Sequence, residues 1–444
     1  MPTRREFLWS TGALLGPALA PARAVQPAVV STDAGRLRRR LERLSQFGRP
    51  AGGTFADGVS RVAYSEADLA ARAWLLDEMR GAGLTSRIDA AGNIFARLGG
   101  RPSAPPILFG SHIDSVPNGG NFDGDLGTLA ALEVLETARA AGLGTSHPLE
   151  MVVWAHEEST AFGRGTACSR IVAGDLKAGD LDQEWNGLRR RDALRRIGGD
   201  PDRIETAVAA PGAWHAYVEL HIEQGGTLDA GGVPIGVVEG IVAIHRYDVT
   251  IDGVANHAGT TPMDIRQDAL VAASQLVLAV RRVAGAREGR QVGTVGRLDV
   301  QPNSPNVVPG RVTLSVEFRD LSPRVLDGLG EAIRAEAAAI ARDTRTTITL
   351  RLASTNPPAP AHAGVMAAIQ ASAARRALTA RVLPSGAGHD AQMIAALCPM
   401  GMIFVPSVGG ISHSPRELTR WDDCARGAET LLDTVLALDR RDSI

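Results

Sequence analysis

The 444-residue sequence has few cysteines, no excess of one charge and no apolar run long enough to span a membrane. Its three cysteines, Cys168, Cys398 and Cys424, lie far apart without C-x-x-C spacing. They predict core thiols, and they argue against an even disulfide framework, thiolate metal ligands or a cysteine nucleophile.

Charge also excludes a class of partner. Lysine plus arginine total 47 and aspartate plus glutamate 49, and no basic run is interleaved with aromatic residues. We therefore expect no nucleic-acid partner. The arginine-rich stretch 189–196 is interpreted as the solvated face of a helix, because the acids around it balance its charge.

The N-terminus carries a targeting pattern. The sequence T-R-R-E-F-L at 3–8 is followed by an apolar run through Ala20 and then by P-A-R-A. Twin arginines, a modest apolar core and an A-x-A end predict a twin-arginine export signal over 1–24, cleaved near Ala24. The alternative is a membrane anchor, but the run is shorter than about 20 residues and Pro17 interrupts it. We expect a periplasmic protein, carried folded by the twin-arginine machinery, with no stable membrane anchor.

The length predicts two domains, and the order of elements predicts an α/β fold. Short apolar runs at Pro106–Gly110 and Glu150–Ala155 are typical of buried parallel strands, and Leu126–Ala141 between them has helical spacing. Further helices are expected at Thr32–Leu44, Ser65–Gly81 and Trp421–Leu438. The β-α-β order indicates a mostly parallel sheet with helices on both faces. We found no role for the helical-looking segment 180–200.

Residues 246–356 follow a different pattern. The expected order is strand, helix, strand, strand, helix, strand, which is typical of a ferredoxin-like unit. These elements are Tyr247–Ile251, Asp268–Val283, Val292–Val300, Val312–Arg319, Pro323–Arg342 and Thr346–Leu352. The stretch 355–360 is predicted to be a linker. The sequence thus predicts one catalytic domain, 32–245 plus 357–444, interrupted by an inserted lid at 246–356.

Polar residues follow the early strands. His112 and Asp114 come directly after the first buried strand, Asp123 precedes a helix, and Glu157 and Glu158 follow the next strand. Because a hydrolytic site is expected at the carboxyl ends of parallel strands, these junctions predict a metal site. Asp114 is expected to accept a hydrogen bond from the His112 ring and fix its tautomer.

Two later histidines are weaker candidates by themselves. The stretch 218–225 alternates, so Glu219, His221 and Glu223 share the polar face of a strand. His413 lies in a glycine-rich loop. Imidazole and carboxylate ligands together suit zinc, manganese, cobalt or nickel, with zinc as the default.

Five motifs occur in one order: G-S-H-I-D-S-V-P-N-G-G-N-F-D-G, H-E-E-S, E-L-H-I-E-Q-G, N-H-A-G-T-T-P-M and G-I-S-H-S-P. Together they resemble the hydantoinase/carbamoylase branch of the M20 metallopeptidase superfamily, over essentially the whole mature chain. L-H-I-E-Q-G favours this amidase branch, because peptidase relatives carry a carboxylate where His221 stands. The resemblance implies a two-metal aminopeptidase-like catalytic domain with an inserted lid that also forms the dimer.

The resemblance also implies residue roles. His112 and His221 would bind one metal, Glu158 and His413 the other, and Asp123 would bridge both. Glu157 would take the proton from the attacking water, with Asp114 as a further catalytic residue.

Lid and loop residues would complete the site by the same resemblance. His257 would stabilise the oxyanion across a homodimer interface, and Arg319 would bind the substrate carboxylate. Asn306 and Gln224 would hold the ureido end. His389 has a structural and a functional interpretation, and the sequence does not separate them.

The function implied is hydrolysis of an N-carbamoyl-L-amino acid to amino acid, ammonia and carbon dioxide by a metal-bridged hydroxide. Allantoate amidohydrolase is the nearest alternative, because its substrate also pairs a carboxylate with a ureido group. A non-catalytic periplasmic binding protein on the same fold is an alternative of another class, against which Glu157 argues. A peptidase is disfavoured by His221.

Overall fold

A computed structural model describes residues 30–444, of which 31–444 form one compact unit. The predicted export signal therefore lies outside the described residues. Among the described helices, none combines the length and apolar character needed to cross a membrane. The three cysteines are buried and unpaired, as predicted.

A nine-stranded mixed sheet, here the large sheet, forms the centre of the fold. Its order is β1-β2-β4-β3-β7-β17-β8-β15, with β16 beside β8. The central strands β4, β3, β7 and β17 run parallel, and antiparallel strands lie toward both edges. The bounds are β1 Thr85–Ile88, β2 Ile94–Leu98, β3 Ile107–His112, β4 Leu149–Trp154, β7 Ala216–Ile222, β8 Ile235–Ile241, β15 Ala359–Pro360, β16 Ala380–Ser385 and β17 Met400–Val405.

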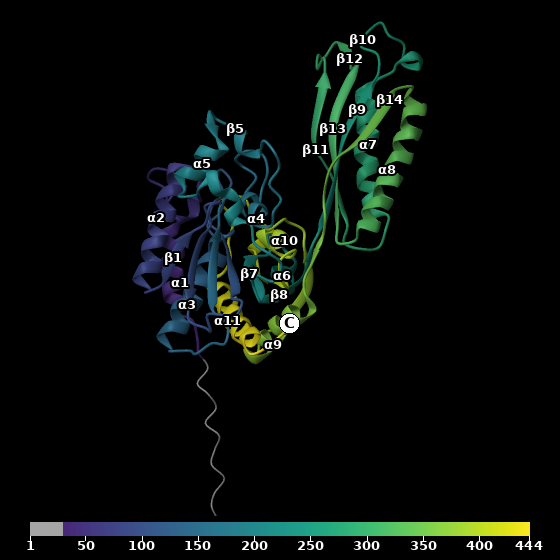
Figure 1. Cartoon of the computed structure of the whole chain (residues 1–444). Coiled ribbons are helices and arrows are strands. Elements are labelled where there is room, and N and C mark those ends of the chain that lie inside the picture. Colours follow the sequence, from purple (N-terminus) through teal and green to yellow (C-terminus); the bar gives the residue numbers. More distant parts are fainter. Residues whose placement is uncertain (1–29) are drawn as a thin grey trace, which may run out of the picture. The chain divides into compact units, whose positions relative to one another are not determined.

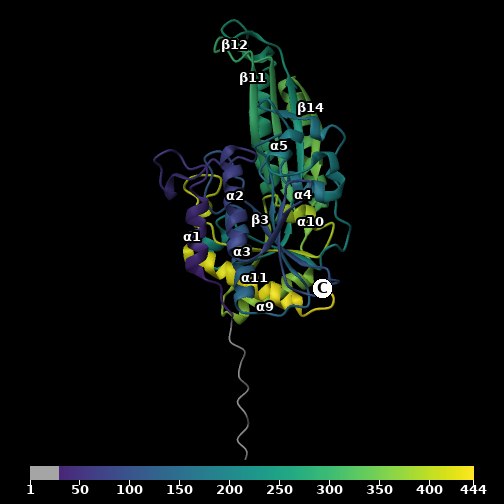
Figure 2. The same ribbon diagram turned by 60° about the vertical axis from the view of Figure 1, so that its left-hand side comes forward.

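Helices cover both faces of the large sheet, as the β-α-β order predicted. On one face α1, α3 and α11 lie against one another, with α9 beside α11 (Figure 2). On the other face α10 packs on β7 and β17 and contacts α4. The bounds are α1 Ala34–Leu44, α2 Glu66–Gly81, α3 Asp125–Ala140, α4 Ala167–Val172, α6 Thr227–Gly231, α9 Ala363–Arg375, α10 Asp390–Ile394 and α11 Trp421–Asp439. The central strands are buried along their whole length, which explains their continuous apolar sequence.

Residues 243–356 form a separate antiparallel sheet, here the small sheet, in the order β11-β13-β9-β14. Helices α7 and α8 cover one of its faces (Figure 1). The elements are β9 Ala243–Asp252, α7 Ala269–Gly285, β11 Val292–Gln301, β13 Arg311–Asp320, α8 Pro323–Thr344 and β14 Thr347–Asn356, with a short β10–β12 pair at Asn256–His257 and Val307–Val308. Alternate residues of β13, Val312 to Phe318, are buried in this core. The elements follow the β-α-β-β-α-β order expected from the sequence.

One local prediction was wrong, and another was right only in part. The stretch 355–360 is strand at both ends, because β14 continues to Asn356 and Ala359–Pro360 pairs with β8. The segment 180–200 contains a 3₁₀ turn at Asp180–Asp182, a hairpin of β5 Glu184–Trp185 and β6 Leu188–Arg189, and the helix α5 Arg190–Arg196, so only its second half has the expected α-helix. Trp185 and Leu188 pack on a neighbouring apolar cluster, and this contact stabilises the hairpin.

Candidate metal centre and active site

The predicted ligands come from four adjacent strands of the large sheet and the loops that follow them, with His413 in the loop after β17. His112 ends β3, His221 lies on β7, and Glu158 follows β4. Neighbouring parallel strands end on the same side of the sheet, so the side chains at their carboxyl ends meet there. The loop with Asp123 reaches the same place because Gly124 has no side chain. A Cβ at Gly124 would lie 2.4 Å from the His112 ring.

Asp123 lies at the centre of the cluster. Its Oδ1 is 3.1 Å from Nε2 of His221 and 3.6 Å from Nε2 of His112. Its Oδ2 is 3.4 Å from Nε2 of His413, which is 3.3 Å from Oε1 of Glu158. Two groups of ligand atoms result, and each lies within 4.8 Å: His112, Asp123 and His221, and Asp123, Glu158 and His413. Asp123 thus offers one oxygen to each group.

The ring nitrogens fit cations rather than hydrogen bonds alone. His221 bonds the Ile222 carbonyl through Nδ1 at 2.9 Å, and its Nε2 is buried with no hydrogen-bond partner among the described residues. His112 bonds the Asp114 carbonyl through Nδ1 at 3.0 Å. Because a carbonyl only accepts, Nδ1 carries a proton, and in the neutral ring the Nε2 lone pair then faces Asp123. A lone pair aimed at a carboxylate oxygen is unfavourable unless a cation lies between them, so the donor set fits two divalent metals sharing Asp123.

Asp114 acts differently from the prediction. Its carboxylate Oδ1 is 3.6 Å from the His112 ring, too far for a hydrogen bond, because the Asp114 main-chain oxygen takes that proton. The carboxylate instead accepts the backbone N–H groups of Glu157 and Glu158, both at 3.1 Å. Asp114 therefore fixes the turn that directs the two glutamates into the site.

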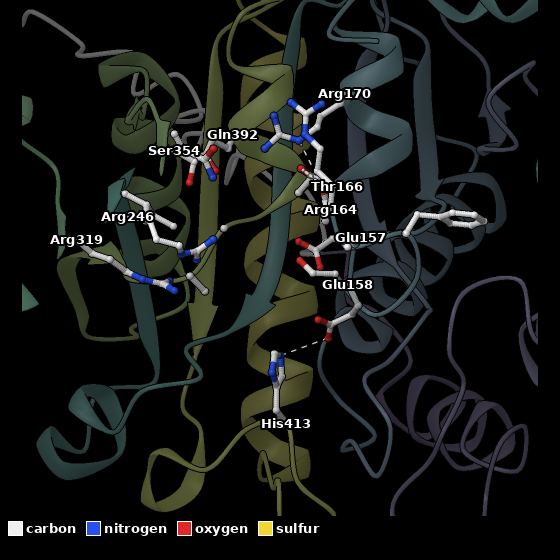
Figure 3. A pocket seen from close by; sticks show the side chains of 18 of the residues that line it. Glu157, Glu158, Arg164, Thr166, Arg170, Arg246, Arg319, Ser354, Gln392 and His413 are labelled. Atoms are coloured by element: carbon white, nitrogen blue, oxygen red, sulfur yellow. Dashed lines mark hydrogen bonds and ion pairs between the residues drawn. The ribbon is translucent and has the colours of Figure 1, made fainter. Parts of the chain in front are cut away.

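Glu157 and Glu158 open into a cavity of about 600 Å³ (Figure 3). Burial raises the pKa of Glu157 well above its ordinary value; His112 opposes the shift, and Glu158 adds to it. Such a pKa suits a group that must accept and return a proton. The cavity also includes His413 and Arg319, and the rest of its small-sheet wall consists of Ile244, Arg246, Ser354 and Asn356.

Arg319 lines the same cavity as Glu157 and the two ligand residues Glu158 and His413. Its Nη1 donates to the Gly386 carbonyl and its Nε to Oε1 of Glu317, both at 2.7 Å. Burial raises the pKa of the Glu317 carboxyl, but Arg319 and Arg246 outweigh it and hold that pKa below its usual range.

Gln224 and His389 also join the cluster. The Gln224 amide donates to Oδ2 of Asp123 at 2.6 Å. The His389 ring stacks edge-on against His221 with centroids 4.5 Å apart, and its Nε2 lies 2.8 Å from the Ser385 hydroxyl. His389 thus orients a ligand ring, from the position just before α10.

His257 and Asn306 are together, but not at the cluster. Both are exposed beside the β10–β12 pair, where the Asn306 carbonyl accepts the Ala258 N–H. The His257 ring accepts the backbone N–H groups of Gly259 and Thr260. Neither residue lines the cavity in the part of this single chain that the structure describes.

Sequence reasoning missed residues that hold the ligands. Oε1 of Glu417 accepts the backbone N–H of Phe122 at 2.9 Å and that of Asp123 at 3.1 Å, and burial raises its pKa to about 7. The Ser412 hydroxyl lies 2.9 Å from Oδ2 of Asp123 and 2.7 Å from Glu417. Glu219 is fully buried and bonded to Ser111. Its place two residues before His221 on the same strand face was the available signal.

Comparison with known proteins identifies the family. The sequence model of the family described as Peptidase family M20/M25/M40 matches residues 108–437 of this chain. An N-carbamoyl-L-amino acid amidohydrolase of Geobacillus stearothermophilus is 41% identical over 405 residues, 91% of this chain and 98% of that protein. The chain belongs to peptidase family M20/M25/M40.

Similarity to two further proteins shows which branch of the M20 family this chain resembles. The allantoate amidohydrolase of Escherichia coli K12 is 36% identical over 403 residues, covering 89% of this chain and 95% of that protein. A crystal structure of an amidase of the hydantoinase/carbamoylase family from Burkholderia multivorans has a TM-score of 0.86 at 36% identity, covering 94% of this chain and 100% of that one. The predicted branch, the amidases of the M20 metal-dependent hydrolases, is confirmed.

Proposed function

We propose that this M20 amidase hydrolyses the ureido C–N bond of an N-carbamoyl-L-amino acid. One water and one substrate give the free amino acid, ammonia and carbon dioxide. The observation that carries the proposal is one cavity lined by Arg319 on one side and by Glu157, Glu158 and His413 of the metal cluster on the other. A small molecule with a carboxylate at one end and a ureido group at the other matches these two walls.

Each residue of the site has its own role in the proposed reaction. His112, Asp123, His221, Glu158 and His413 would hold two divalent metals, zinc by default and otherwise manganese, cobalt or nickel. Such ions lower the pKa of water and polarise a carbonyl oxygen. Glu157, held by Asp114, takes the proton of the attacking water and delivers it to the leaving nitrogen. Arg319 binds the substrate carboxylate through its planar guanidinium.

Allantoate is the second candidate substrate, favoured by the similarity to the Escherichia coli enzyme. Its carboxylate and ureido groups would meet the same Arg319 and the same cluster. A purely binding protein is less consistent with these residues, because binding needs no buried proton acceptor at Glu157.

The test is ammonia release from N-carbamoyl-L-amino acids and from allantoate, before and after chelation and metal restoration. We expect metal-dependent release, and the preferred substrate decides between the two candidates. Glu157→Gln should lower kcat by about 10²–10⁴-fold while the metal content stays the same. No release from protein shown to hold two metals would contradict the proposal.

Assembly and location are further proposals. His257 and Asn306 are exposed at the separate β10–β12 pair, and neither lines the cavity among the described residues of their own chain. We propose that the protein forms a homodimer in which His257 of one subunit reaches the active site of the other and stabilises the oxyanion that develops on the substrate there. The export signal predicts a periplasmic enzyme, which cell fractionation would test.

A further inference from the structure

The cavity wall formed by the small sheet carries a second arginine that the proposed reaction does not use. Arg246 on β9 lies directly opposite Glu317 on β13 and Ser354 on β14. Glu317 and Arg319 are two residues apart, so they share one face of β13. The other face buries Val316 and Phe318 in the small-sheet core. The polar row therefore faces the cavity, with Arg246 and Arg319 both in its lining (Figure 3).

One carboxylate holds both guanidinium groups. Oε1 of Glu317 accepts from Nε of Arg319 at 2.7 Å, and Oε2 accepts from Nε of Arg246 at 3.0 Å. Two cations share one anion, so this pair keeps a net positive charge. Among the described residues Arg246 pairs only with Glu317, and about half of its side chain is exposed.

The opposite wall shows that this imbalance is specific to the small sheet. Arg164 and Arg170 also line the cavity. Both bind Asp175, at 2.6 and 2.9 Å, and Arg164 lies 3.8 Å from Asp180. Two cations there face two anions, so that wall attracts a further anion less strongly.

We infer that Arg246 and Arg319 form a double carboxylate clamp, and that the preferred substrate is an N-carbamoyl amino acid with a second carboxylate in its side chain. The inference rests on the proposed function. Arg319 binds one carboxylate and Arg246 the other. The two guanidinium groups flank a single carboxylate, a spacing that two carboxylates joined by a short carbon chain can match. Glu317 occupies Nε of both guanidinium groups, so each substrate carboxylate would be bound through the Nη N–H groups.

The experiment compares N-carbamoyl-L-aspartate and N-carbamoyl-L-glutamate with N-carbamoyl-L-alanine, using the metal-loaded full chain. The wild type should prefer a dicarboxylate. Arg246→Gln should lower kcat/KM for that dicarboxylate by about tenfold or more, because a site built around a polar group loses most when the pairing is lost. The loss should lie mainly in KM, and Arg246→Lys should restore part of it. The alanine derivative should change less than about threefold.

Two variants control for fold and for carboxylate binding in general. Arg351→Gln removes an arginine that pairs with Asp248 across the same sheet, outside the cavity lining, and should leave both activities unchanged. Arg319→Gln should lower both activities.

Three outcomes would overturn the inference. An equal fall with both substrates in Arg246→Gln would mean that Arg246 only holds Arg319 through Glu317. Wild-type turnover without preference for a dicarboxylate would refute the clamp and leave the proposed function standing. No turnover of any N-carbamoyl amino acid would refute both.

Discussion

Asp123 links the two ligand groups, and its position depends on residues from three parts of the chain. Gln224 and Ser412 contact its Oδ2, and Glu417 accepts its backbone N–H. The motifs predicted that Asp123 is a ligand, but not which groups hold it. Asp114 illustrates the same limit. The sequence predicts that Asp114 lies beside His112, but whether its carboxylate or its main-chain oxygen binds the ring depends on distances of 3.6 and 3.0 Å.

Asp68 provides a test of buried charge at the residue scale. It lies on α2, fully enclosed, where its carboxylate accepts the Tyr64 N–H at 2.7 Å. Burial raises its pKa to about 6, although Arg72 opposes the shift. The unfolded carboxyl titrates near 3.9. The folded state thus binds the proton more tightly, so the contribution of Asp68 to stability is full below pH of about 4 and is lost as pH rises through about 6.

We expect the free energy of unfolding of the wild type, relative to Asp68→Asn, to fall by about 2–3 kcal/mol between pH 4 and pH 8. Urea denaturation at both pH values measures this difference, in which the fixed cost of the substitution cancels. Asp77→Asn, at an exposed position on the same helix, should show no such change. If the difference in unfolding free energy between the wild type and Asp68→Asn does not change with pH, the raised pKa of Asp68 is contradicted.

At the scale of elements, local patterns predicted type and order well where the periodicity was long. Helices α2 and α8 begin at or next to the predicted residues, since Ser65 caps one and Pro323 starts the other. Short segments failed because their structure depends on distant partners. Ala359–Pro360 is a strand only because β8 lies beside it, and the β5–β6 hairpin packs through Trp185 on a cluster from elsewhere in the chain.

Gly127 shows tertiary contact overriding helix propensity. It lies in the first turn of α3, where an added Cβ would be 2.0 Å from the Leu220 carbonyl of β7 and 2.8 Å from Cβ of Ser111 on β3. Alanine normally favours a helix over glycine by up to about 1 kcal/mol. Here we expect Gly127→Ala to destabilise the fold by about 2 kcal/mol or more, because the helix must move off the strands that carry His112 and His221.

Gly81→Ala is the matched control, since nothing lies within 4 Å of that position at the end of α2. It should be neutral or stabilising by up to about 1 kcal/mol in the same urea titrations. Equal effects of the two substitutions would refute the close packing of α3 on the large sheet.

At the scale of the whole molecule, the cavity needs both sheets. The metal cluster lies at the carboxyl ends of the central parallel strands of the large sheet, while Arg319 and Arg246 come from the small sheet. Metals that bind only the folded chain stabilise it by mass action. Chelation should therefore lower the thermal midpoint by about 5 °C or more as it removes activity, and returning zinc or manganese should restore both.

Glu158→Gln should show a smaller midpoint shift on chelation, because it weakens one ligand group and leaves His112, Asp123 and His221 in place. Differential scanning fluorimetry at matched metal content measures both shifts. If the thermal midpoint stays unchanged in protein shown to be metal-free, the proposal that metal binding to the folded cluster stabilises the protein is wrong.

The sequence alone determined the type and order of the long helices and strands, the family motifs and the residues expected in the cluster, because these depend on local periodicity and residue chemistry. Only the tertiary structure decided which atoms meet: the shared oxygens of Asp123, the backbone role of Asp114, and the pairing of Arg246 with Arg319 through Glu317. It also separated His257 and Asn306 from the cavity of their own chain. Such relations depend on strand register and on packing between residues far apart in the chain, which no local pattern encodes.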